Sequence, residues 1–201
     1  MAETRSSLRT DAILDAALEL AARGGFDSVR QREVAARANV ALGTLYKRFR
    51  SKEDLLAAVM AREAERLERK LERRPARGPT VEKRVAAFFI VATQHICKQP
   101  RVAHAMIRAM ASGVPEVAAK VVGYQGRMTG LVIAAMRGRG KLEFMDASLA
   151  PPTEPEMTYA FMLLQLWFAC LVGWSAGLFD QAGIDAQMTR ATYVVAKGLG
   201  I

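Results

Sequence analysis

The chemistry that the sequence offers most clearly is the binding of phosphate groups by clustered cationic side chains. Residues 28–52 hold seven lysines and arginines against a single acid, Glu33, and so contribute +6 of the chain's formal charge of +9. Such a segment attracts a polyanionic partner such as a nucleic acid, an anionic membrane surface or an acidic protein. Within it Gly43 lies in a helical pattern, where a glycine costs about 1 kcal/mol relative to alanine. We therefore expect a partner to approach the backbone closely at Gly43.

Two short helices on either side of Asn39 would position these side chains. The spacing of apolar residues predicts one helix over about Val29–Ala38 and a second over about Ala41–Phe49. Asparagine is one of the few residues other than glycine that tolerate a left-handed backbone, so Asn39 suits the turn of a helix-turn-helix. The residues expected to form the small core shared by the two helices are Val34, Ala35, Val40, Leu45 and Phe49.

The second short helix has the side chains expected of a helix that enters the DNA major groove. Small residues at its N-terminal end would let its backbone approach the base edges, and the methyl groups of Leu42 and Thr44 suit contact with thymine. Cations at the starts of neighbouring helices would position the protein on the phosphates. The predicted DNA-binding residues are Arg30, Gln31, Arg32, Ala41, Leu42, Gly43, Thr44, Tyr46, Lys47 and Lys52.

The stretch "SVRQREVAARANVALGTLYKRFRSKEDLL" resembles the DNA-binding domain of TetR-type transcriptional regulators, above all in its GTLYxxFxSKxxL pattern, Gly43 to Leu55. The resemblance implies a homodimeric, all-α repressor that binds a palindromic operator and is released by a small molecule. Two positions depart from the family pattern. Asn39 replaces the more usual glycine, and Leu42 stands where many members carry a polar or basic residue, so the family's base preference does not transfer.

Helical spacing of apolar residues extends through almost the whole chain, and no run alternates with period two. We predict an all-α fold of about nine helices, in which an N-terminal helix-turn-helix domain is followed by a helical ligand-binding and dimerisation bundle. Gly24 and Gly25 would end a first helix that begins near Ser7. Ser51, three residues before Asp54, resembles a capping box that starts a helix to about Arg73.

Composition changes from basic to strongly apolar across Arg73–Thr80, which contains two prolines and a glycine. We expect the DNA-binding domain to cover residues 1–52 and the effector-binding and dimerisation domain to cover residues 53–201. Further helices are expected at about 81–98, 101–111, 115–137, 156–179 and 185–198, with a long loop over Gly138–Pro155.

The segment Ala160–Phe179 is apolar enough to span a membrane and carries Gly173 and Gly177 at GxxxG spacing. Its acidic flanks and the absence of a nearby cationic cluster favour a buried helix instead, packed in a homodimer between its own core and the partner. A membrane-associated helical protein with its basic N-terminal half on anionic lipid is the alternative function. The expected interface residues are Trp167, Gly173, Trp174, Gly177, Met188, Thr192 and Val195.

The sequence gives little support for a catalytic site. "GWSAG", Gly173 to Gly177, matches the GxSxG of serine hydrolases, but that motif needs a preceding strand and a later histidine, and the last histidine is His104. Cys97 and Cys170 lack metal-ligand spacing, which favours reduced thiols in a cytoplasmic protein. Residues 1–11 lack the apolar core of a signal peptide. We therefore expect neither an enzyme nor a cofactor or metal site.

Large and pliable apolar side chains in the C-terminal half form a candidate effector pocket, for which ordinary core packing is the alternative interpretation. His95, Gln94 and Gln165 could orient a polar end of the ligand, or serve as hydrogen-bonded core residues. The order "LLQLWFACLVGW…ATYVVAKGLG" resembles the branch of the family that regulates sterol catabolism in actinobacteria, which implies a steroid or acyl-CoA type of effector. The candidate residues are Phe88, Phe89, His95, Met106, Met110, Tyr124, Met128, Leu131, Phe161, Gln165 and Phe168.

Overall fold

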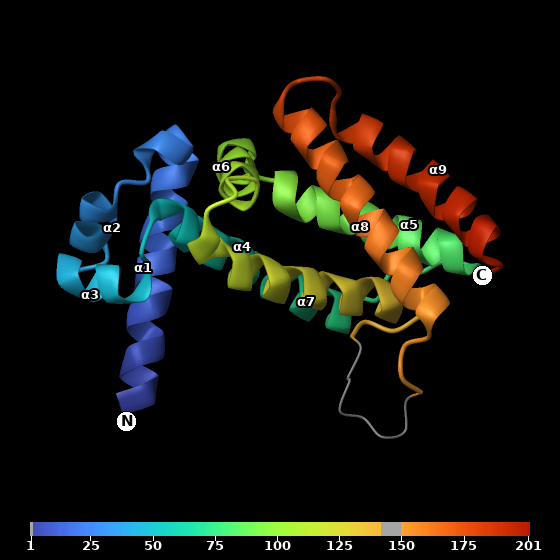
Figure 1. Ribbon diagram of the computed structural model, residues 1–201, viewed down its shortest axis with the longest axis horizontal. Coiled ribbons are helices and arrows are strands. Elements are labelled where there is room, and N and C mark those ends of the chain that lie inside the picture. The colour runs from blue at the N-terminus through green and yellow to red at the C-terminus, as the bar shows by residue number, and fades with distance from the viewer. Residues whose placement is uncertain (1, 142–149) are drawn as a thin grey trace. The chain divides into compact units, whose positions relative to one another are not determined.

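The computed structural model describes residues 2–141 and 150–201, and these are all-helical, as predicted (Figure 1). The described residues form nine α-helices and two short 3-10 helices. They divide into two compact units. Unit 1 consists of Met1–Glu63 and Lys98–Gly123, and unit 2 of Ala64–Cys97 and Tyr124–Ile201. Residues 98–123 thus pack with the N-terminal part of the chain, so the compact units are a different division from the expected functional domains 1–52 and 53–201, which stay a prediction.

Unit 1 packs short helices against the long first helix. Its core includes Ile13, Ala17 and Leu20, which lie on one face of the first helix as their spacing predicts, together with Val34 and Leu45. The expected helix over residues 115–137 is a 3-10 turn followed by an α-helix. The elements are α1 (Ala2–Gly24), η1 (Phe26–Ser28), α2 (Gln31–Arg37), α3 (Leu42–Arg48), α4 (Lys52–Arg73), α6 (Pro100–Met110), η2 (Pro115–Val117) and α7 (Ala118–Met136), of which α4 and α7 continue into unit 2.

Unit 2 is completed by α5 (Val81–Cys97), α8 (Glu154–Ser175) and α9 (Gln181–Leu199), and α9 packs on both α5 and α8 (Figure 1). The ring of Phe89 lies 5.0 Å from that of Phe88 and 5.7 Å from that of Trp167, centroid to centroid. The Trp167 indole N–H donates a hydrogen bond of 2.9 Å to the Thr93 hydroxyl in the same core. Aromatic packing and this buried hydrogen bond thus join α5 to α8.

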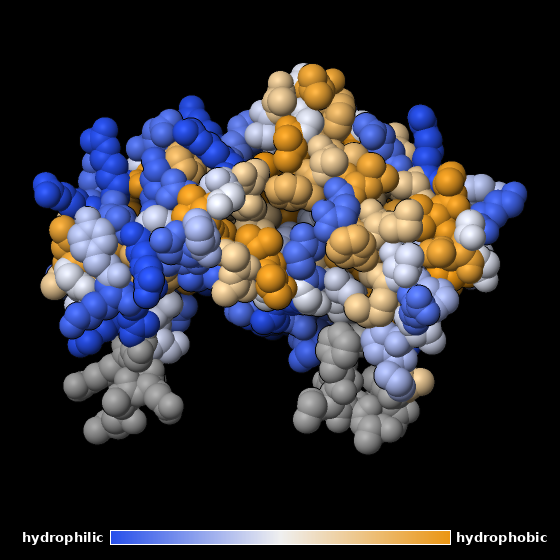
Figure 2. All heavy atoms as spheres, viewed as in Figure 1, coloured by the Kyte–Doolittle hydropathy of each residue, from blue (hydrophilic) through white to orange (hydrophobic). Residues whose placement is uncertain are grey.

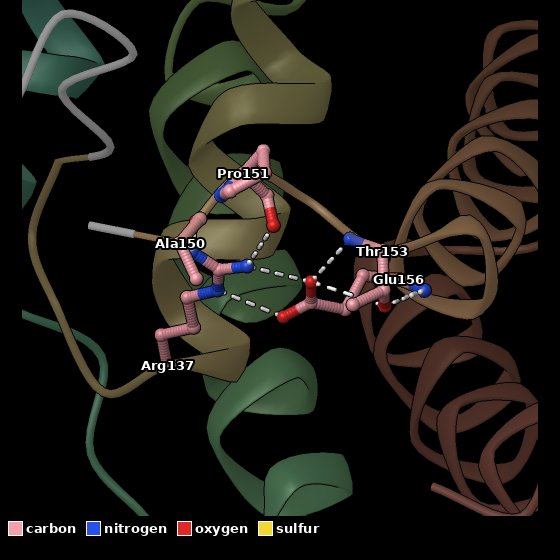
Figure 3. A network of polar contacts seen from close by, with 5 residues as sticks. All are labelled: Arg137, Ala150, Pro151, Thr153 and Glu156. Atoms are coloured by element: carbon pink, nitrogen blue, oxygen red, sulfur yellow. Dashed lines mark hydrogen bonds and ion pairs between the residues drawn. The ribbon is translucent and has the colours of Figure 1, made fainter. Parts of the chain in front are cut away.

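The end of α7 is joined to the start of α8 by Arg137 (Figure 3). Its guanidinium donates to the Glu156 carboxylate at 2.8 and 2.7 Å and to the carbonyl of Ala150 at 2.7 Å. The N–H of Thr153, the N-cap of α8, donates to the same carboxylate at 2.8 Å. The hydrogen bonds from Arg137 are the main reason that the pKa of Glu156 lies below its usual value. The middle of the predicted loop, residues 142–149, lies outside the described residues.

Helix α8 is long and apolar enough to cross a membrane by length and composition, with a mean hydropathy of 1.5 over its most apolar window. A core helix of a globular protein passes the same test, and 44% of that window is buried inside the chain. One face of α8 therefore packs in unit 2 while another face carries exposed apolar side chains. Helix α8 ends at Ser175, four residues before the predicted end.

Candidate nucleic-acid interface

The turn between α2 and α3 has the geometry that the sequence predicts. Asn39 has a φ of 51° and is the one non-glycine residue of the described chain with a positive φ. Its N–H donates to the Ala36 carbonyl at 3.2 Å, and the N–H of Val40 donates to the Ala35 carbonyl at 3.0 Å. This is the Schellman pattern, which satisfies the last carbonyls of α2 and turns the chain sharply into α3.

The two faces of α3 differ in burial. Leu45 is fully buried against unit 1, whereas Tyr46 is 46% exposed and Lys47 is also exposed. Ala41 is the N-cap of α3, and its methyl side chain cannot accept a hydrogen bond from the first N–H groups of the helix. Exposed Ala41 and Gly43 therefore leave the N-terminal backbone of α3 accessible to a partner.

Contacts within the chain do not explain why position 43 is a glycine. A Cβ added to it would meet no atom within 4 Å, so packing does not require a glycine there. Its φ is not positive, so the backbone does not require one either. Because an exposed glycine weakens a helix relative to alanine, its position on the accessible side of α3 is consistent with close approach of an external molecule.

The cations that flank α3 are held by specific partners. The Lys52 ammonium, at the start of α4, lies 4.0 Å from the centroid of the Phe26 ring and 3.8 Å from the Asp27 carboxylate. Arg108 of α6 lies 4.1 Å from the same ring and 3.5 Å from the same carboxylate. Two cations share one acid, so this cluster keeps a net positive charge. Arg30 and Arg32 are exposed, and the Arg30 guanidinium lies 3.6 Å from the Glu33 carboxylate.

Gln31 has an internal partner that the sequence did not indicate. Its side-chain amide donates to the Phe49 carbonyl at 3.0 Å and so links the start of α2 to the end of α3. This bond helps to fix the angle between the two helices. It uses one of the two amide N–H groups, so Gln31 can do this in addition to any contact with a partner.

The start of α4 is capped as the Ser51–Asp54 spacing predicts. The N–H of Asp54 donates to the Ser51 hydroxyl at 3.0 Å, and the N–H of Arg50 donates to the Asp54 carboxylate at 3.0 Å. The sequence did not indicate that Lys120 of α7 forms an ion pair with this carboxylate, which is only 3% exposed. The two residues lie far apart in the chain, and no local spacing links them.

The expected effector residues are divided between the two units. Met106 and Met110 belong to unit 1, whereas the remaining candidates belong to unit 2. On α8, Phe161 is 60% exposed and Gln165 is also exposed, which removes both from the buried set. His95 and Phe168 are half-buried. The candidates buried in unit 2 are Phe88, Phe89, Tyr124, Met128 and Leu131.

Tyr124 carries the one unexplained polar group among these buried candidates. Its hydroxyl oxygen is buried and has no hydrogen-bond partner in residues 2–141 and 150–201. Burial raises the pKa of Tyr124, so the group is a neutral donor. A buried donor without an acceptor costs about 1–3 kcal/mol, and a ligand with an acceptor oxygen would recover part of that cost.

The expected dimer-interface residues are used largely inside the chain. Trp167, Met188 and Thr192 are buried in unit 2, where the Tyr159 hydroxyl donates to the Thr192 carbonyl at 2.9 Å. These three side chains therefore pack within the chain's own core. Trp174 and Val195 are half-buried.

The GxxxG pair has internal functions as well. A Cβ at Gly173 would lie 2.8 Å from the Phe179 ring, so this glycine makes room for an aromatic residue of the same chain. Gly177 has a φ of 78°, and its N–H donates to the Trp174 carbonyl at 3.0 Å. It therefore terminates α8 by a left-handed C-cap, which explains why the helix stops before Phe179.

The exposed apolar surface of unit 2 is formed by other residues. Figure 2 shows hydrophobic side chains over α8 and over the turn that follows it. The α8/α9 apolar face is defined here as Met157, Phe161, Met162, Leu166 and Val172 of α8, Leu178 of the turn, and Tyr193 and Val194 of α9. Large exposed apolar patches of this kind mark sites of association.

Two protein families match this chain. The family of "Bacterial regulatory proteins, tetR family" matches residues 13–59, and that of "Tetracyclin repressor-like, C-terminal domain" matches residues 78–195. The chain is 34% identical over 166 residues to the HTH-type transcriptional repressor KstR of Rhodococcus jostii strain RHA1, a match that covers 83% of this chain and 72% of that protein. Together the two family matches cover the helix-turn-helix and most of unit 2.

Solved structures share the fold. A TetR transcriptional regulator from Rhodococcus sp. RHA1 superposes with a TM-score of 0.82 at 26% identity, over 95% of this chain and 97% of the other. FadR of Bacillus subtilis, solved in complex with stearoyl-CoA, superposes with a TM-score of 0.56 at 18% identity, over 90% of this chain and 96% of the other. The second likeness concerns the fold alone.

Proposed function

This chain belongs to the TetR family of bacterial regulatory proteins, and from that premise we propose that it binds a palindromic operator as a homodimer and leaves it when a hydrophobic effector binds. It is a helix-turn-helix transcriptional regulator and not an enzyme. The observation that carries the proposed DNA contact is Gly43, an exposed glycine that neither packing nor backbone conformation requires.

In the proposed complex, α3 enters the major groove. Ala41, Gly43 and the partly exposed Leu42 and Thr44 meet the bases, while Tyr46 and Lys47 contact phosphates, together with Arg30, Arg32 and Lys52. Each phosphate neutralised by a cation adds about 0.9 to the slope of log affinity against log salt. Two copies of α3 need a separation of about 34–36 Å to enter successive major grooves of a palindrome.

The proposed homodimer forms through the α8/α9 apolar face. In a homodimer with two-fold symmetry the same surface meets itself, so an exposed patch on α8 and α9 buries its equivalent in the partner. Phe161→Asp would place a charge on this face without touching the core of the chain. We expect monomers by light scattering for this variant and dimers for Val122→Asp, which places the same charge on an exposed apolar residue of α7 outside the face. A Phe161→Asp dimer of unchanged stability would contradict the proposed interface.

The proposed effector is apolar with at least one hydrogen-bond acceptor. Buried Phe88, Phe89, Met128 and Leu131 supply apolar surface in unit 2, and Tyr124 supplies the donor without a partner. The similarity to KstR and the stearoyl-CoA bound by Bacillus subtilis FadR make steroid and fatty acyl thioesters the first compounds to screen. Thermal-shift measurements should show stabilisation by such compounds. Stabilisation by small polar molecules alone would contradict the proposal.

Coupling between effector and operator would pass along α4 and α7, since both helices continue from one unit into the other. The ion pair from Lys120 to Asp54 fixes the first turn of α7 to the cap of α4 inside unit 1. An effector that prefers a second arrangement of these helices would weaken operator binding, typically by about 1–3 kcal/mol of coupling free energy.

The decisive test of the proposed function is selection of duplexes by the purified protein from a random-sequence pool, followed by footprinting. We expect a near-palindromic site whose affinity falls steeply with salt. Tyr46→Ala should weaken that binding while leaving the dimer intact. Failure to bind any duplex at low ionic strength, together with sedimentation of the protein on anionic vesicles, would favour the membrane-associated alternative that the composition of α8 allows.

A further inference from the structure

We propose that the second half of α4 forms a binding site for a small ligand that carries two or more clustered phosphate groups. A cavity of about 370 Å³ in unit 2 is lined by Arg66, Arg69, Lys70, Arg73 and Arg74. Its volume falls at the lower end of the roughly 300–1,000 Å³ typical of small-molecule sites. Five positive charges and no negative charge line it.

Three acids of the same half of α4, Glu65, Glu68 and Glu72, are engaged by other elements. The Arg127 guanidinium of α7 lies 3.3 Å from the Glu65 carboxylate and also pairs with Glu68. The Lys141 ammonium lies 3.2 Å from the Glu72 carboxylate. In the part of the chain that the structure describes, no acidic side chain forms an ion pair with the cavity residues of the last two turns, Arg69, Lys70, Arg73 and Arg74.

The spacing concentrates the charge on one side of the helix. Positions 66, 69, 70, 73 and 74 follow the three- and four-residue intervals that share one helical face. Arg66 and Lys70, Arg69 and Arg73, and Lys70 and Arg74 are like-charged pairs four residues apart, which repel one another. The helix dipole favours cations in the last turn alone, so it does not explain Arg66 and Arg69, which lie seven and four residues before the end at Arg73.

The side chains indicate the class of ligand. Guanidinium groups bind phosphate oxygens through paired N–H donors, and four of the five lining residues are arginines. One phosphate would neutralise two of the five charges, whereas a pyrophosphate, or a pyrophosphate with a further phosphate, would neutralise most of them. All five residues are exposed, so the ligand would remain partly in water.

Coenzyme A and nucleoside di- or triphosphates share this chemistry. If the ligand is the coenzyme A portion of an effector, then α4 binds the polar end of that effector. In that case the inference rests on the effector response proposed above. If it is a nucleotide, the site is a second input to the regulator. The measurement must therefore compare the two sources.

The test is isothermal titration of the full-length protein with inorganic pyrophosphate, coenzyme A and ATP at low ionic strength. We expect binding of pyrophosphate and of one of the two larger molecules, which identifies the source. Arg69→Ala with Arg73→Ala should weaken binding at least tenfold. Lys83→Ala with Lys98→Ala removes the same charge from exposed positions outside this cluster and outside the α8/α9 apolar face, and should leave binding unchanged.

Three results would overturn the inference: no binding of any of the three compounds, equal weakening in both double variants, or loss of operator affinity in the α4 variant with no binding of small phosphates. The last result would make the cluster a contact to the DNA backbone. The proposed function is tested separately, because Tyr46→Ala should weaken operator binding and leave pyrophosphate binding unchanged. Circular dichroism of each variant checks that it is folded.

Discussion

Among the described helices, α3, α7, α8 and α9 contain interior glycines, and the reasons for the glycines of α8 and α3 differ. In α8, an added Cβ at Gly173 would lie 2.8 Å from the Phe179 ring, so the chain's own packing requires the glycine. In α3, an added Cβ at Gly43 would meet nothing within 4 Å. A residue that the fold requires carries little information about partners. Gly123 and Gly126 of α7 are also exposed and equally open around an added Cβ. What distinguishes Gly43 is its place in the second helix of the helix-turn-helix, within the basic segment, and there it points to a partner outside the chain.

Two buried aromatic residues show the same contrast between a residue with a partner inside the chain and a residue without one. Trp167 and Tyr124 are both buried aromatic residues in unit 2, but the Trp167 indole N–H has an acceptor in Thr93 whereas the Tyr124 hydroxyl has none among the described residues. Trp167 therefore belongs to the structural core, and Tyr124 is a candidate contact to a ligand. Substitutions at each position should separate effects on stability from effects on binding.

Trp167→Ala should have the largest effect on stability. It removes a buried indole and leaves the Thr93 hydroxyl without its donor, and such truncations cost about 3–5 kcal/mol of unfolding free energy. Urea unfolding measures this loss. The control is Phe161→Ala on the exposed face of α8, which should change the unfolding free energy of a single chain by less than about 0.5 kcal/mol. Similar losses in both variants would contradict the division of α8 into a core face and an exposed face.

Tyr124→Phe should change stability and effector response in opposite directions. Removing a buried hydroxyl that lacks an acceptor should raise the unfolding free energy of the free protein by about 1 kcal/mol. The same change removes the proposed donor to the effector, so a higher effector concentration should be needed to release the operator. Tyr159→Phe is the matched control, because the Tyr159 hydroxyl donates to the Thr192 carbonyl and its loss should destabilise the protein.

Glu156→Gln should destabilise the protein near neutral pH by about 1 kcal/mol, since it removes a charged acceptor from Arg137. The folded-state pKa of Glu156 is lowered, so its contribution is fully present above the unfolded-state pKa and is lost as the pH falls through the folded-state pKa. The difference in unfolding free energy between wild type and variant should therefore shrink in acid. Glu154→Gln in the same turn of α8 is the control. An equal pH dependence for both variants would contradict the assignment of this dependence to Glu156 and its pairing with Arg137.

Local signals in the sequence predicted the local geometry. The left-handed turn at Asn39 and the cap formed by Ser51 and Asp54 depend on residue types within a few positions of each other, and both are confirmed. The pairs that join distant segments, Lys120 with Asp54 and Arg137 with Glu156, were not predicted. Their spacing follows from the packing of helices, which no local pattern encodes.

Helix α8 shows why the rest of the candidate site could not be predicted. Apolar residues surround it on every side, so periodicity could not separate the buried Trp167 from the exposed Phe161. Gly173 and Gly177 matched a helix-packing motif, but their reasons lie in Phe179 and in a left-handed C-cap. Only the packed structure distinguishes these explanations.

The central claim is that α3 presents Gly43 to DNA at a cost to the protein's own stability. The most direct test is to measure operator affinity and unfolding free energy together for Gly43→Ala. We predict that operator affinity falls at least tenfold while the unfolding free energy rises by up to about 1 kcal/mol, because alanine favours the helix. Unchanged operator affinity in a stabilised Gly43→Ala protein would contradict the claim.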